Sequence, residues 1–495
     1  MQQLIVVSRA EDWPLEIEGV ERVLARDYLT NPDWSERRST RVYNLCRSYG
    51  YQSNGYYVSL LAAARGHKPL PSVATLQDFR APNIVRMTGV ELARLIETSL
   101  KPLQSDEFTL SIYFGRNLAR RYDRLSRGLF NLFPAPLLRA RFQKLAEGWS
   151  LKRIAPVSFS DIPESHLDFV REAATRYFSG KRPRSPRSKV SRFDLAMLVN
   201  PSEEHPPSDE KALARFERAG EAVGFHVERL GSDEIGRLAE FDALFIRETT
   251  AVNHHTYRFA RKAAAEGLVV IDDPDSILKC TNKVYLAELL QRHGVAAPKT
   301  LLVHRDNAGE VESRLGLPVV LKQPDSAFSL GVVRVEDRET LDTTVREMLR
   351  RSELIVAQEY LPTSFDWRVG VIGGRPLYVC RYHMARGHWQ IYNHAAASDS
   401  SDEDEGMADT LSVGEAPEAV VQTAVRAAGL IGTGLYGVDL KEVDGRVLVI
   451  EVNDNPSIDA GCEDAVLRDA LYREIMGVMF KRVTERKLGR WSGIE

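Results

Sequence analysis

The sequence lacks the features that mark disulfide scaffolds, membrane proteins and nucleic-acid-binding proteins. Its four cysteines are spread over 495 residues and form no CxxC pair, so buried or incidental thiols in a reducing compartment are expected. No apolar run approaches the roughly 20 residues of a membrane span, and the short run Leu4–Val7 has no positive flank, so no signal peptide is expected. The net charge of −3 gives no global field for nucleic acid or membrane. We therefore expect a cytoplasmic protein with neither partner.

What is present is an ordinary globular composition, with 43% hydrophobic and 27% charged residues, which is enough to bury a sizeable core. The length predicts about three folding units. We divide the chain into an N-terminal α/β domain at 1–150, a helix and basic Pro/Ser linker at 151–191, an α/β domain at 192–275, and a last domain at 276–485. The linker prediction rests on Ser179–Arg192, which is rich in Ser, Pro and basic residues and has no apolar face.

The N-terminal 150 residues predict an α/β unit. The segments LIVVSR and VYNLCRS are typical of strands, and Tyr56–Arg65 is typical of a helix that ends at Gly66. The stretch Gly115–Lys144 is strongly basic and is expected to be helical; it is either a solvated helix face or a docking surface for an acidic partner. Ser160–Glu164 is expected to open a further helix.

The middle of the chain alternates strands and helices. Strands are predicted at 193–200, 241–248 and 268–274, and a helix near 209–223. This alternation indicates a parallel sheet. Further on, the acidic run Asp399–Glu405 is either a mobile solvated loop or a lid segment that faces substrate.

The segment YGVDLKEVDGRVLVIEVNDNPSID, residues 436–459, predicts a β-hairpin around Asp444-Gly445. A two-residue turn would pair Asp439 with Ile450 and mix polar and apolar residues on both faces. A three-residue loop, Val443-Asp444-Gly445, separates the faces, with Val438, Leu440, Leu448, Ile450 and Val452 on one side. On the other it brings together Asp439, Glu451 and Asn453. Such hard oxygen ligands suit Mg²⁺; the alternative is a polar, solvent-facing side of the hairpin.

Two lysines stand at positions that suit phosphate binding. Lys283 lies in the first turn of a helix that Thr281 or Asn282 caps and that ends at His293-Gly294, where the helix dipole disfavours a cation unless an anion is bound. Lys322 ends a predicted strand and precedes a loop of small residues able to bring backbone N–H groups to phosphate. The loop residues concerned are Ser326, Ser329 and Gly331.

The segment IVAQEYL, residues 355–361, predicts a buried strand that ends in a backbone hinge able to pair with the edge of adenine. The hinge consists of Gln358, Glu359, Tyr360 and Leu361, and a carboxylate there can hold ribose hydroxyls. Asp366-Trp367-Arg368 then begins a hairpin around Gly373-Gly374, and Arg368 is placed to face a developing phosphoryl charge.

In this order, the motifs resemble the ATP-grasp superfamily, over roughly residues 190–480. Those that carry the resemblance are Lys283, Lys322 with its Ser/Gly loop, the Gln358–Leu361 hinge, Asp366-x-Arg368, Asp439 in GVDL, and Glu451 and Asn453 in VIEVNDNPS. Within the superfamily the sequence is most similar to RimK-type α-L-glutamate ligases, and its first 150 residues resemble the extra domain of longer RimK-like proteins. The resemblance implies an α/β fold with a parallel-sheet pre-ATP-grasp domain and a two-lobed, α+β ATP-grasp domain built on antiparallel sheets.

The resemblance also implies roles for these residues. Lys283 and Lys322 would contact ATP phosphates, Glu359 and Asp366 would lie near ribose and adenine, and Ser326–Gly331 would be the lid loop. The divalent metals, Mg²⁺ or Mn²⁺, would be held by Asp439, Glu451 and Asn453. One departure is that RimK-type ligases usually carry an arginine near the γ-phosphate, whereas the comparable place here offers Gln390 or Asn393, with Arg381 and Arg386 close by.

The implied activity is that of an ATP-dependent carboxylate–amine ligase that works through an acyl phosphate and that adds glutamate or another amino acid to an amino acid, peptide or protein acceptor. Arg368 and Lys322 would be the catalytic residues. Two alternatives stay open: another ATP-grasp outcome, such as a D-Ala–D-Ala-type ligase or phosphotransferase, and a nucleotide-binding docking module without chemistry. We further expect a homo-oligomer, and an N-terminal domain that recruits or orients the acceptor.

Overall fold

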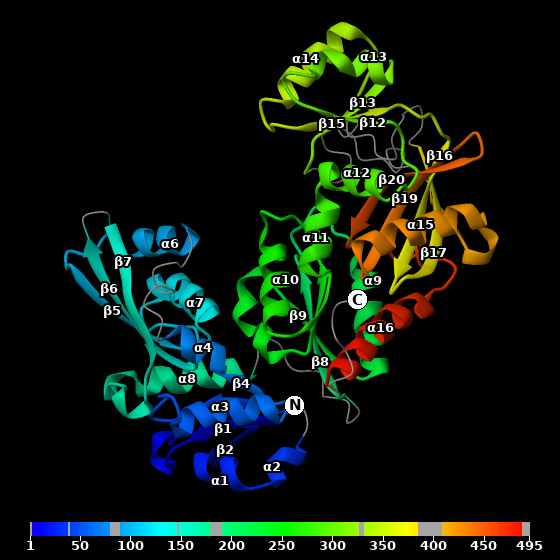
Figure 1. The fold of residues 1–495 in the computed structure, drawn as a ribbon. Helices are drawn as coiled ribbons and strands as arrows, with labels where there is room; N and C mark the ends of the chain where they lie inside the picture. The colour runs from blue at the N-terminus through cyan, green and yellow to red at the C-terminus, as the bar shows by residue number, and fades with distance from the viewer. Residues whose placement is uncertain are drawn as a thin grey trace. The chain divides into compact units, whose positions relative to one another are not determined.

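The computed structural model describes residues 2–37, 40–79, 90–145, 148–179, 191–325, 331–384 and 408–487. The chain forms two compact units (Figure 1). Unit 1 comprises Met1–Asp194 together with Asp233–Asp242, and unit 2 comprises Leu195–Ser232 and Ala243–Glu495. A short piece of the later sequence therefore folds as part of the N-terminal unit.

Unit 1 begins with a parallel sheet in the order β2-β1-β3-β4. Its strands are β1 (Gln2–Val7), β2 (Val20–Leu24), β3 (Thr40–Asn44) and β4 (Lys68–Leu70). The helices of this part are α1 (Ala25–Thr30), α2 (Asp33–Glu36), α3 (Asn54–Ala64) and α4 (Val73–Asp78). The predicted strands and the predicted helix are confirmed, and Gly66 has the left-handed conformation (φ 70°) expected after the end of a helix.

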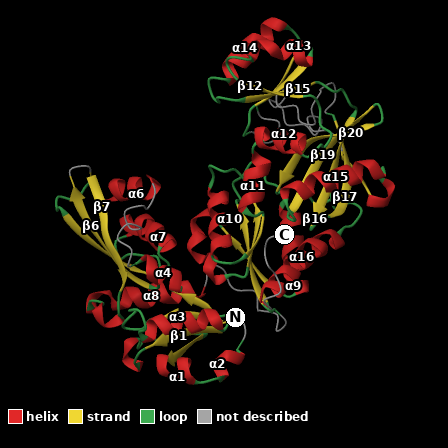
Figure 2. Cartoon of the chain, viewed as in Figure 1, coloured by secondary structure: helices red, strands yellow, loops and turns green. Residues whose placement is uncertain are grey.

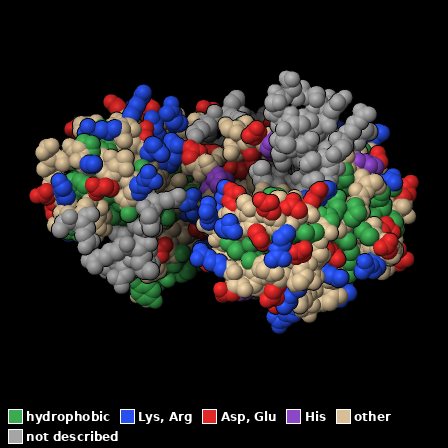
Figure 3. All heavy atoms as spheres, turned by 90° about the horizontal axis from the view of Figure 1, so that it is seen from above, with side chains coloured by type: hydrophobic (Ala, Val, Ile, Leu, Met, Phe, Trp, Pro, Cys, Tyr) green, Lys and Arg blue, Asp and Glu red, His purple; other side chains and the backbone are tan. Residues whose placement is uncertain are grey.

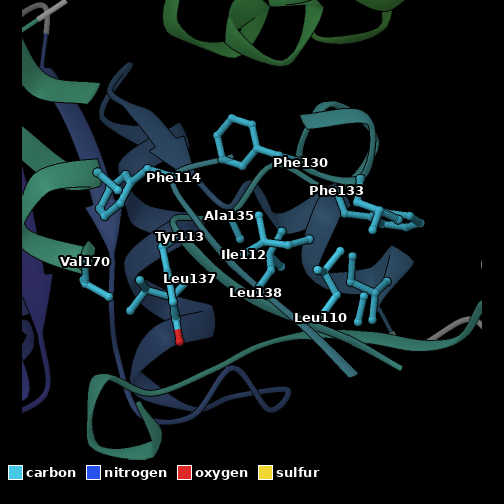
Figure 4. Close-up of a cluster of buried hydrophobic side chains, with 14 of the residues drawn as sticks. Leu110, Ile112, Tyr113, Phe114, Phe130, Phe133, Ala135, Leu137, Leu138 and Val170 are labelled. Carbon is cyan, nitrogen blue, oxygen red and sulfur yellow. The ribbon is translucent and has the colours of Figure 1, made fainter. Parts of the chain in front are cut away.

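The rest of unit 1 is an antiparallel sheet in the order β5-β6-β7 with helices packed on it. The strands are β5 (Glu107–Tyr113), β6 (Leu137–Leu145) and β7 (Gly148–Pro156), and the helices are α6 (Val90–Leu100), α7 (Asp123–Leu132) and α8 (Leu167–Ser179). Alternate residues of β5 and β6, among them Leu110, Ile112 and Leu138, point into an apolar core (Figure 4).

Two expectations for unit 1 are wrong. The basic stretch 115–144 is not one helix, because only Asp123–Leu132 is α-helical and Arg139 and Arg141 lie on strand β6. The alternation of buried and exposed residues in LLRARFQKL has the period of a strand. The helix prediction considered the number of arginines and not this period. Likewise, Ser160–Glu164 forms short 3₁₀ turns (Phe159–Asp161 and Glu164–His166), and α8 starts only at Leu167. The predicted linker lies almost wholly outside the described residues.

Unit 2 begins with a second parallel sheet, in the order β11-β10-β8-β9. Its strands are β8 (Phe193–Val199), β9 (Phe225–Leu230), β10 (Ala243–Arg247) and β11 (Val269–Ile271), and its helices are α9 (Glu210–Val223), α10 (His255–Ala265) and α11 (Pro274–Thr281). Helix α10 covers one face of the sheet, and α9 with α16 (Asp469–Lys487) covers the other (Figure 2). The three predicted strands and the helix near 209–223 are confirmed.

Two antiparallel sheets follow. The first has the order β12-β15-β13-β14, with β12 (Thr300–Val303), β13 (Val319–Lys322), β14 (Val332–Val335) and β15 (Ile355–Glu359). The second has the order β18-β17-β16-β19-β20, with β16 (Phe365–Ile372), β17 (Arg375–His383), β18 (Ala408–Leu411), β19 (Leu435–Val443) and β20 (Arg446–Asp454). The accompanying helices are α12 (Lys283–Arg292), α13 (Val311–Leu315), α14 (Arg338–Met348) and α15 (Glu418–Ile431). The fold is α/β with both parallel and antiparallel sheets, as predicted.

The hairpin of β19 and β20 has a different register from the one expected. Val443 pairs with Arg446, so Asp444 and Gly445, with φ of 50° and 72°, form a two-residue turn rather than a three-residue loop. Further from the turn the register shifts between Asp439 and Leu440, so that Asp439 pairs with Glu451. The shift is a β-bulge, which adds one residue to one strand.

The bulge explains why the predicted polar face survives a wrong register. A two-residue turn plus one bulged residue moves the pairing by an even number of residues relative to the predicted loop, and side chains alternate with period two. The apolar assignment is corrected in part: the core contains Val438, Leu440, Val449 and Val452. Val449 is therefore an addition to the predicted apolar residues, Leu448 is buried as predicted, and Ile450 is only partly buried.

The four cysteines are free thiols, and three of them are buried. Within the described ranges, no helix has the length and apolar character needed to cross a bilayer. The face of the molecule in Figure 3 shows Lys and Arg interspersed with Asp and Glu, as the small net charge suggests.

Candidate functional site

The start of helix α12 brings a lysine to a glutamate of strand β20. The side chain of Asn282 caps the helix by accepting hydrogen bonds from the N–H groups of Val284 and Tyr285, as predicted. Lys283 follows at the first helical position, where its side chain is only 9% exposed, and its Nζ lies 3.0 Å from Oε1 of Glu451. A cation at a helix N-terminus is unfavourable, and here the carboxylate of Glu451 compensates for it.

The second lysine closes the same region from strand β13. Nζ of Lys322 donates a hydrogen bond of 2.8 Å to Oε1 of Gln358 on the neighbouring strand β15. Nε2 of Gln358 donates in turn to Oγ1 of Thr300, at 3.1 Å. Burial lowers the pKa of Lys322 to about 8, against the opposing attraction of Glu451. An anion beside this ammonium would therefore be strongly favoured.

Strands β16, β19 and β20 supply the remaining charges. Arg368 pairs with Asp439 across neighbouring strands, and its guanidinium grips both carboxylate oxygens, with Nη2 2.8 Å from Oδ2. Nδ2 of Asn453 donates to the same Oδ2 at 3.0 Å. Asp439, Glu451 and Asn453 thus share one face of the sheet, and each of them has a hydrogen-bonding or ionic partner.

The charge balance of this cluster is close to neutral. Burial would raise the pKa of Glu451, but Lys283 and then Lys322 draw it below its ordinary value. Asp366 interacts electrostatically with both Lys322 and Asp439, and Nζ of Lys441 and Oγ1 of Thr363 donate to its Oδ1. Cationic and anionic groups from four strands and one helix therefore converge at one place.

The predicted hinge residues after Gln358, at the end of β15, bind neighbouring residues outside the charged cluster. Glu359 lies opposite Lys299, the residue before β12; the backbone N–H of Lys299 donates to Oε1 of Glu359 at 2.8 Å, and the N–H of Glu359 donates to the carbonyl of Lys299. Tyr360 accepts a hydrogen bond of 3.3 Å from Nη1 of Arg334, and Leu361 is half-buried. The carbonyl of Gly331 (φ 74°) accepts from the N–H of Gln323, at the base of the predicted lid loop.

Several predicted residues lie outside the described ranges. They are Ser326, Ser329, Arg386, Gln390, Asn393 and the acidic run 399–405. Arg381 is described: its Nη2 is 4.0 Å from Oδ2 of Asp409.

The sequence interpretation missed Arg247, at the end of β10. It is fully buried and donates to Oδ1 of Asn455 (2.7 Å), to Oγ of Ser208 (2.8 Å) and to the carbonyl of Pro456 (2.9 Å). It therefore fixes the loop directly after Asn453. An arginine that ends the apolar run ALFIR was the available signal, because a buried arginine requires a full set of acceptors.

Comparisons with known proteins agree with this architecture. A family model described as the RimK-like ATP-grasp N-terminal domain matches residues 25–173. A second model, described as the D-ala D-ala ligase C-terminus, matches residues 289–461. A probable alpha-L-glutamate ligase of Marinomonas sp. (strain MWYL1) is 27% identical over 236 residues, which are 47% of this chain and 74% of the relative. Another, of Aliivibrio fischeri (strain MJ11), is 27% identical over 260 residues, 52% of this chain and 82% of the relative.

Among solved structures, a RimK domain ATP-grasp protein of Sphaerobacter thermophilus covers 57% of this chain and 98% of its own, with a TM-score of 0.45 and 15% identity.

The two family matches and the curated relatives identify the chain as an ATP-dependent carboxylate–amine ligase that is similar to proteins of the ATP-grasp superfamily. Residues 25–173 match the RimK-like ATP-grasp N-terminal domain, and the later part of the chain is similar to probable alpha-L-glutamate ligases.

Proposed function

We propose that the cluster around Glu451 is the ATP and metal site of this ligase, and that the enzyme adds an amino acid, with glutamate the first candidate, to an amino acid, peptide or protein acceptor. The observation that carries the proposal is the Lys283–Glu451 ion pair of 3.0 Å, in which a lysine at a helix start is held by a carboxylate on a strand. In the nucleotide complex, Lys283 and Lys322 would exchange protein acceptors for phosphate oxygens.

The donor set fits a hard divalent ion. Asp439 and Glu451 pair directly across β19 and β20, and Asn453 adds an amide oxygen on the same face, which is the ligand chemistry of Mg²⁺ or Mn²⁺. Such an ion would neutralise charge on the phosphates. Asp439 is held by Arg368, so metal binding requires this pair to loosen, and the freed guanidinium would then face the transferred phosphoryl group.

The reaction itself follows from carboxylate chemistry. A carboxylate is a poor electrophile, so ATP first converts it to an acyl phosphate, and an amine then attacks the acyl carbon while phosphate leaves. The tasks of the protein are to align the carboxylate with the γ-phosphate, to balance charge and to exclude water. Lys322 and Arg368 would perform the charge balance, and Glu359 and Asp366 would lie near adenine and ribose.

The choice of glutamate rests on the curated relatives, which are described as probable alpha-L-glutamate ligases. The match to the D-ala D-ala ligase C-terminus supports D-alanine as the second candidate. The two are distinguished by incubating the purified enzyme with ATP, Mg²⁺ and each amino acid in turn, then measuring ADP and phosphate release and the product mass. ADP release with D-alanine alone would refute the glutamate assignment. Ligation would be refuted if ADP release did not depend on an amino acid in any mixture that contains candidate acceptors.

For the N-terminal unit we propose recruitment or orientation of the acceptor. Exposed arginines on and before α7 support this role: Arg120, Arg121, Arg124 and Arg127. Because Asp233–Asp242 folds as part of unit 1, deleting residues 1–178 would strip that segment of its partners. Replacing Arg120, Arg121 and Arg124 by glutamine in the full chain is a cleaner test. An unchanged KM for the acceptor would refute the proposal. The predicted domain boundaries and the homo-oligomer stay predictions.

A further inference from the structure

Three potential metal ligands lie together away from the ATP-grasp cluster. Glu248 directly follows strand β10, His254 immediately precedes helix α10, and His255 is its first residue. One ligand atom of each lies within 4.8 Å of the others. Among the residues that the structure describes, this is the one group of three or more histidine, cysteine or acidic side chains with that arrangement.

The three potential ligands lie at the carboxyl end of β10, at the place in a parallel sheet where α/β folds commonly bind ligands. The sheet order is β11-β10-β8-β9, so the chain leaves β8 toward β9 on one side and leaves β10 toward β11 on the other. Between β8 and β10 the connections diverge, and α/β folds commonly bind ligands beyond the carboxyl ends of the strands at such a point. Asn200 directly follows β8, and its Nδ2 donates to Oε1 of Glu248 at 3.2 Å. The group therefore spans the point where the two connections separate.

The carboxylate of Glu248 is held as a metal ligand would be. Its side chain is only 2% exposed. Asn200 holds Oε1, and Nε2 of His255 lies 2.8 Å from Oε2. Oε1 is thus fixed by Asn200, and Oε2 faces the imidazole of His255. In metal proteins, hydrogen bonds of this kind orient the side chains that bind the ion.

His254 is oriented in the same way. Its Nδ1 lies 3.2 Å from Oγ1 of Thr256, and that hydroxyl donates to the carbonyl of Thr249 at 3.4 Å. Since a hydroxyl has a single hydrogen, Oγ1 must accept from Nδ1 of His254. The lone pair of this imidazole is therefore on Nε2, which is the tautomer that a metal bound through Nε2 requires.

We propose that Glu248, His254 and His255 bind one divalent first-row transition-metal ion of the Zn²⁺ class. Two imidazole nitrogens and one carboxylate oxygen are ligands that Zn²⁺ accepts and that differ from the all-oxygen set preferred by Mg²⁺. The ion takes the place of the hydrogen bond between Nε2 of His255 and Oε2 of Glu248, and the imidazole binds it in the neutral form with its proton on Nδ1. Its remaining position is open to water or to a carboxylate or amine of a substrate.

The site is connected to the ligase core through the backbone of one of its own residues. Nδ2 of Asn455 donates to the carbonyl of Glu248 at 2.7 Å, and Asn455 lies two residues after Asn453. A bound ion would thus fix the loop 249–254 and the turn that follows β20. The proposal does not depend on the ATP site, because the metal alone is the probe.

The test uses tag-free, full-length protein loaded with Zn²⁺ and dialysed against buffer that contains excess Mg²⁺, which occupies the all-oxygen ligands. Plasma mass spectrometry is expected to find one zinc per chain, and X-ray absorption two imidazole nitrogens at about 2.0–2.1 Å. His254→Gln and His255→Gln should lose the zinc. His304→Gln, at a half-exposed histidine of the first antiparallel sheet region, should keep it.

Circular dichroism and thermal unfolding of the metal-free variants check that they fold. If one variant fails to fold, the X-ray absorption spectrum of the wild-type protein still identifies the ligands of the zinc. Failure of the wild type to retain zinc would overturn the proposal, as would equal retention by His254→Gln or a spectrum with oxygen ligands alone. Zinc binding with no ATP-dependent ligation would overturn the proposed function and leave this inference intact.

Discussion

Each unit of the molecule contains a glutamate that lies among cations, and the two clusters differ in burial and in the kind of cation. In unit 1, Glu240 is 5% exposed. Nη1 of Arg41 (2.6 Å) and Nη2 of Arg237 (3.2 Å) bind Oε2, and the hydroxyl of Tyr177 donates to Oε1 at 2.6 Å. Burial alone would raise the pKa of Glu240, yet Arg41 and Arg237 bring it down to about 2.

In unit 2, the side chain of Glu451 is 27% exposed and its ionic partner is a lysine. Arginine offers a rigid fork of donors, whereas lysine is a compact charge on a flexible stem. The arginines of the Glu240 cluster thus keep their carboxylate and anchor residues 233–242 in unit 1, which makes it the closed cluster. In the open cluster around Glu451, Lys283 can release the carboxylate and bind phosphate, and the carboxylate can then bind a metal ion. Burial and charge alone do not distinguish a structural from a functional ion pair; the kind of cation and the access of solvent do.

The largest change in unfolding free energy is expected when the Glu240 cluster is broken. Glu240→Gln removes the carboxylate that Arg41 binds and one of the two carboxylates that Arg237 binds, and removal of one partner of a buried pair costs about 3–5 kcal/mol. Urea denaturation should show this loss for unit 1, with ATP affinity unchanged at a temperature where the variant is folded. Glu172→Gln, at a glutamate 61% exposed in its pair with Arg116, is the matched control.

The pH dependence of that loss has a definite sign. The pKa of Glu240 is lowered from 4.5 to about 2, so its charge stabilises the folded state above pH 4.5, and the contribution disappears as pH falls toward 2. The difference in unfolding free energy between wild type and Glu240→Gln should therefore shrink over this window. A difference independent of pH would contradict the role of the charge.

The next effect is expected at the open cluster. Glu451→Gln removes a proposed metal ligand and the partner of Lys283, and turnover should fall roughly 100- to 1,000-fold, as when one electrostatic partner of a transition state is removed. Stability should change far less than in Glu240→Gln, because the side chain is partly solvated. Glu353→Gln, at an exposed position, controls for the substitution. Full activity of Glu451→Gln would refute the metal assignment.

The same contrast shows what the sequence could and could not predict. The face shared by Asp439, Glu451 and Asn453 followed from strand periodicity, which depends only on the parity of the register. The turn length and the bulge at Ile450 could not be predicted, because several combinations give the same parity. Arg247 and Glu240 were missed for a related reason. The apolar run before Arg247 could indicate that this arginine is buried, but no local pattern identifies partners as distant in sequence as Asn455 for Arg247 and Arg41 for Glu240.

A smaller effect is expected when the lysines are removed one at a time. Lys283→Ala and Lys322→Ala should each weaken ATP binding about tenfold, which corresponds to roughly 1.4 kcal/mol. Calorimetry measures this directly, with Lys481→Ala, at a side chain 76% exposed, as the control. Unchanged affinity in both variants would exclude the two lysines from the phosphate site.

Lys322 should also couple nucleotide binding to pH. Its pKa is about 8 before the nucleotide binds, and phosphate beside the ammonium would raise it. Binding at pH 8.5 should therefore take up protons, while binding at pH 6.5 should not involve this group. Calorimetry in buffers of different ionisation enthalpy gives the number of protons, and the uptake at pH 8.5 should be lost in Lys322→Met. Equal uptake in the variant would assign the proton elsewhere.

The smallest effect on unfolding free energy is expected at a surface ion pair that, like the Glu240 cluster, joins residues 233–242 to another part of unit 1. Arg127 contacts Asp233, but both side chains are nearly half-exposed, at 45% and 47%. An exposed pair contributes about 0–1 kcal/mol, because solvent screens the charges and two long side chains lose freedom. Arg127→Ala should therefore lower the unfolding free energy of unit 1 by less than about 1 kcal/mol in the same urea titration. A loss as large as that of Glu240→Gln would mean that surface charge, and not the buried arginines, holds residues 233–242 in unit 1.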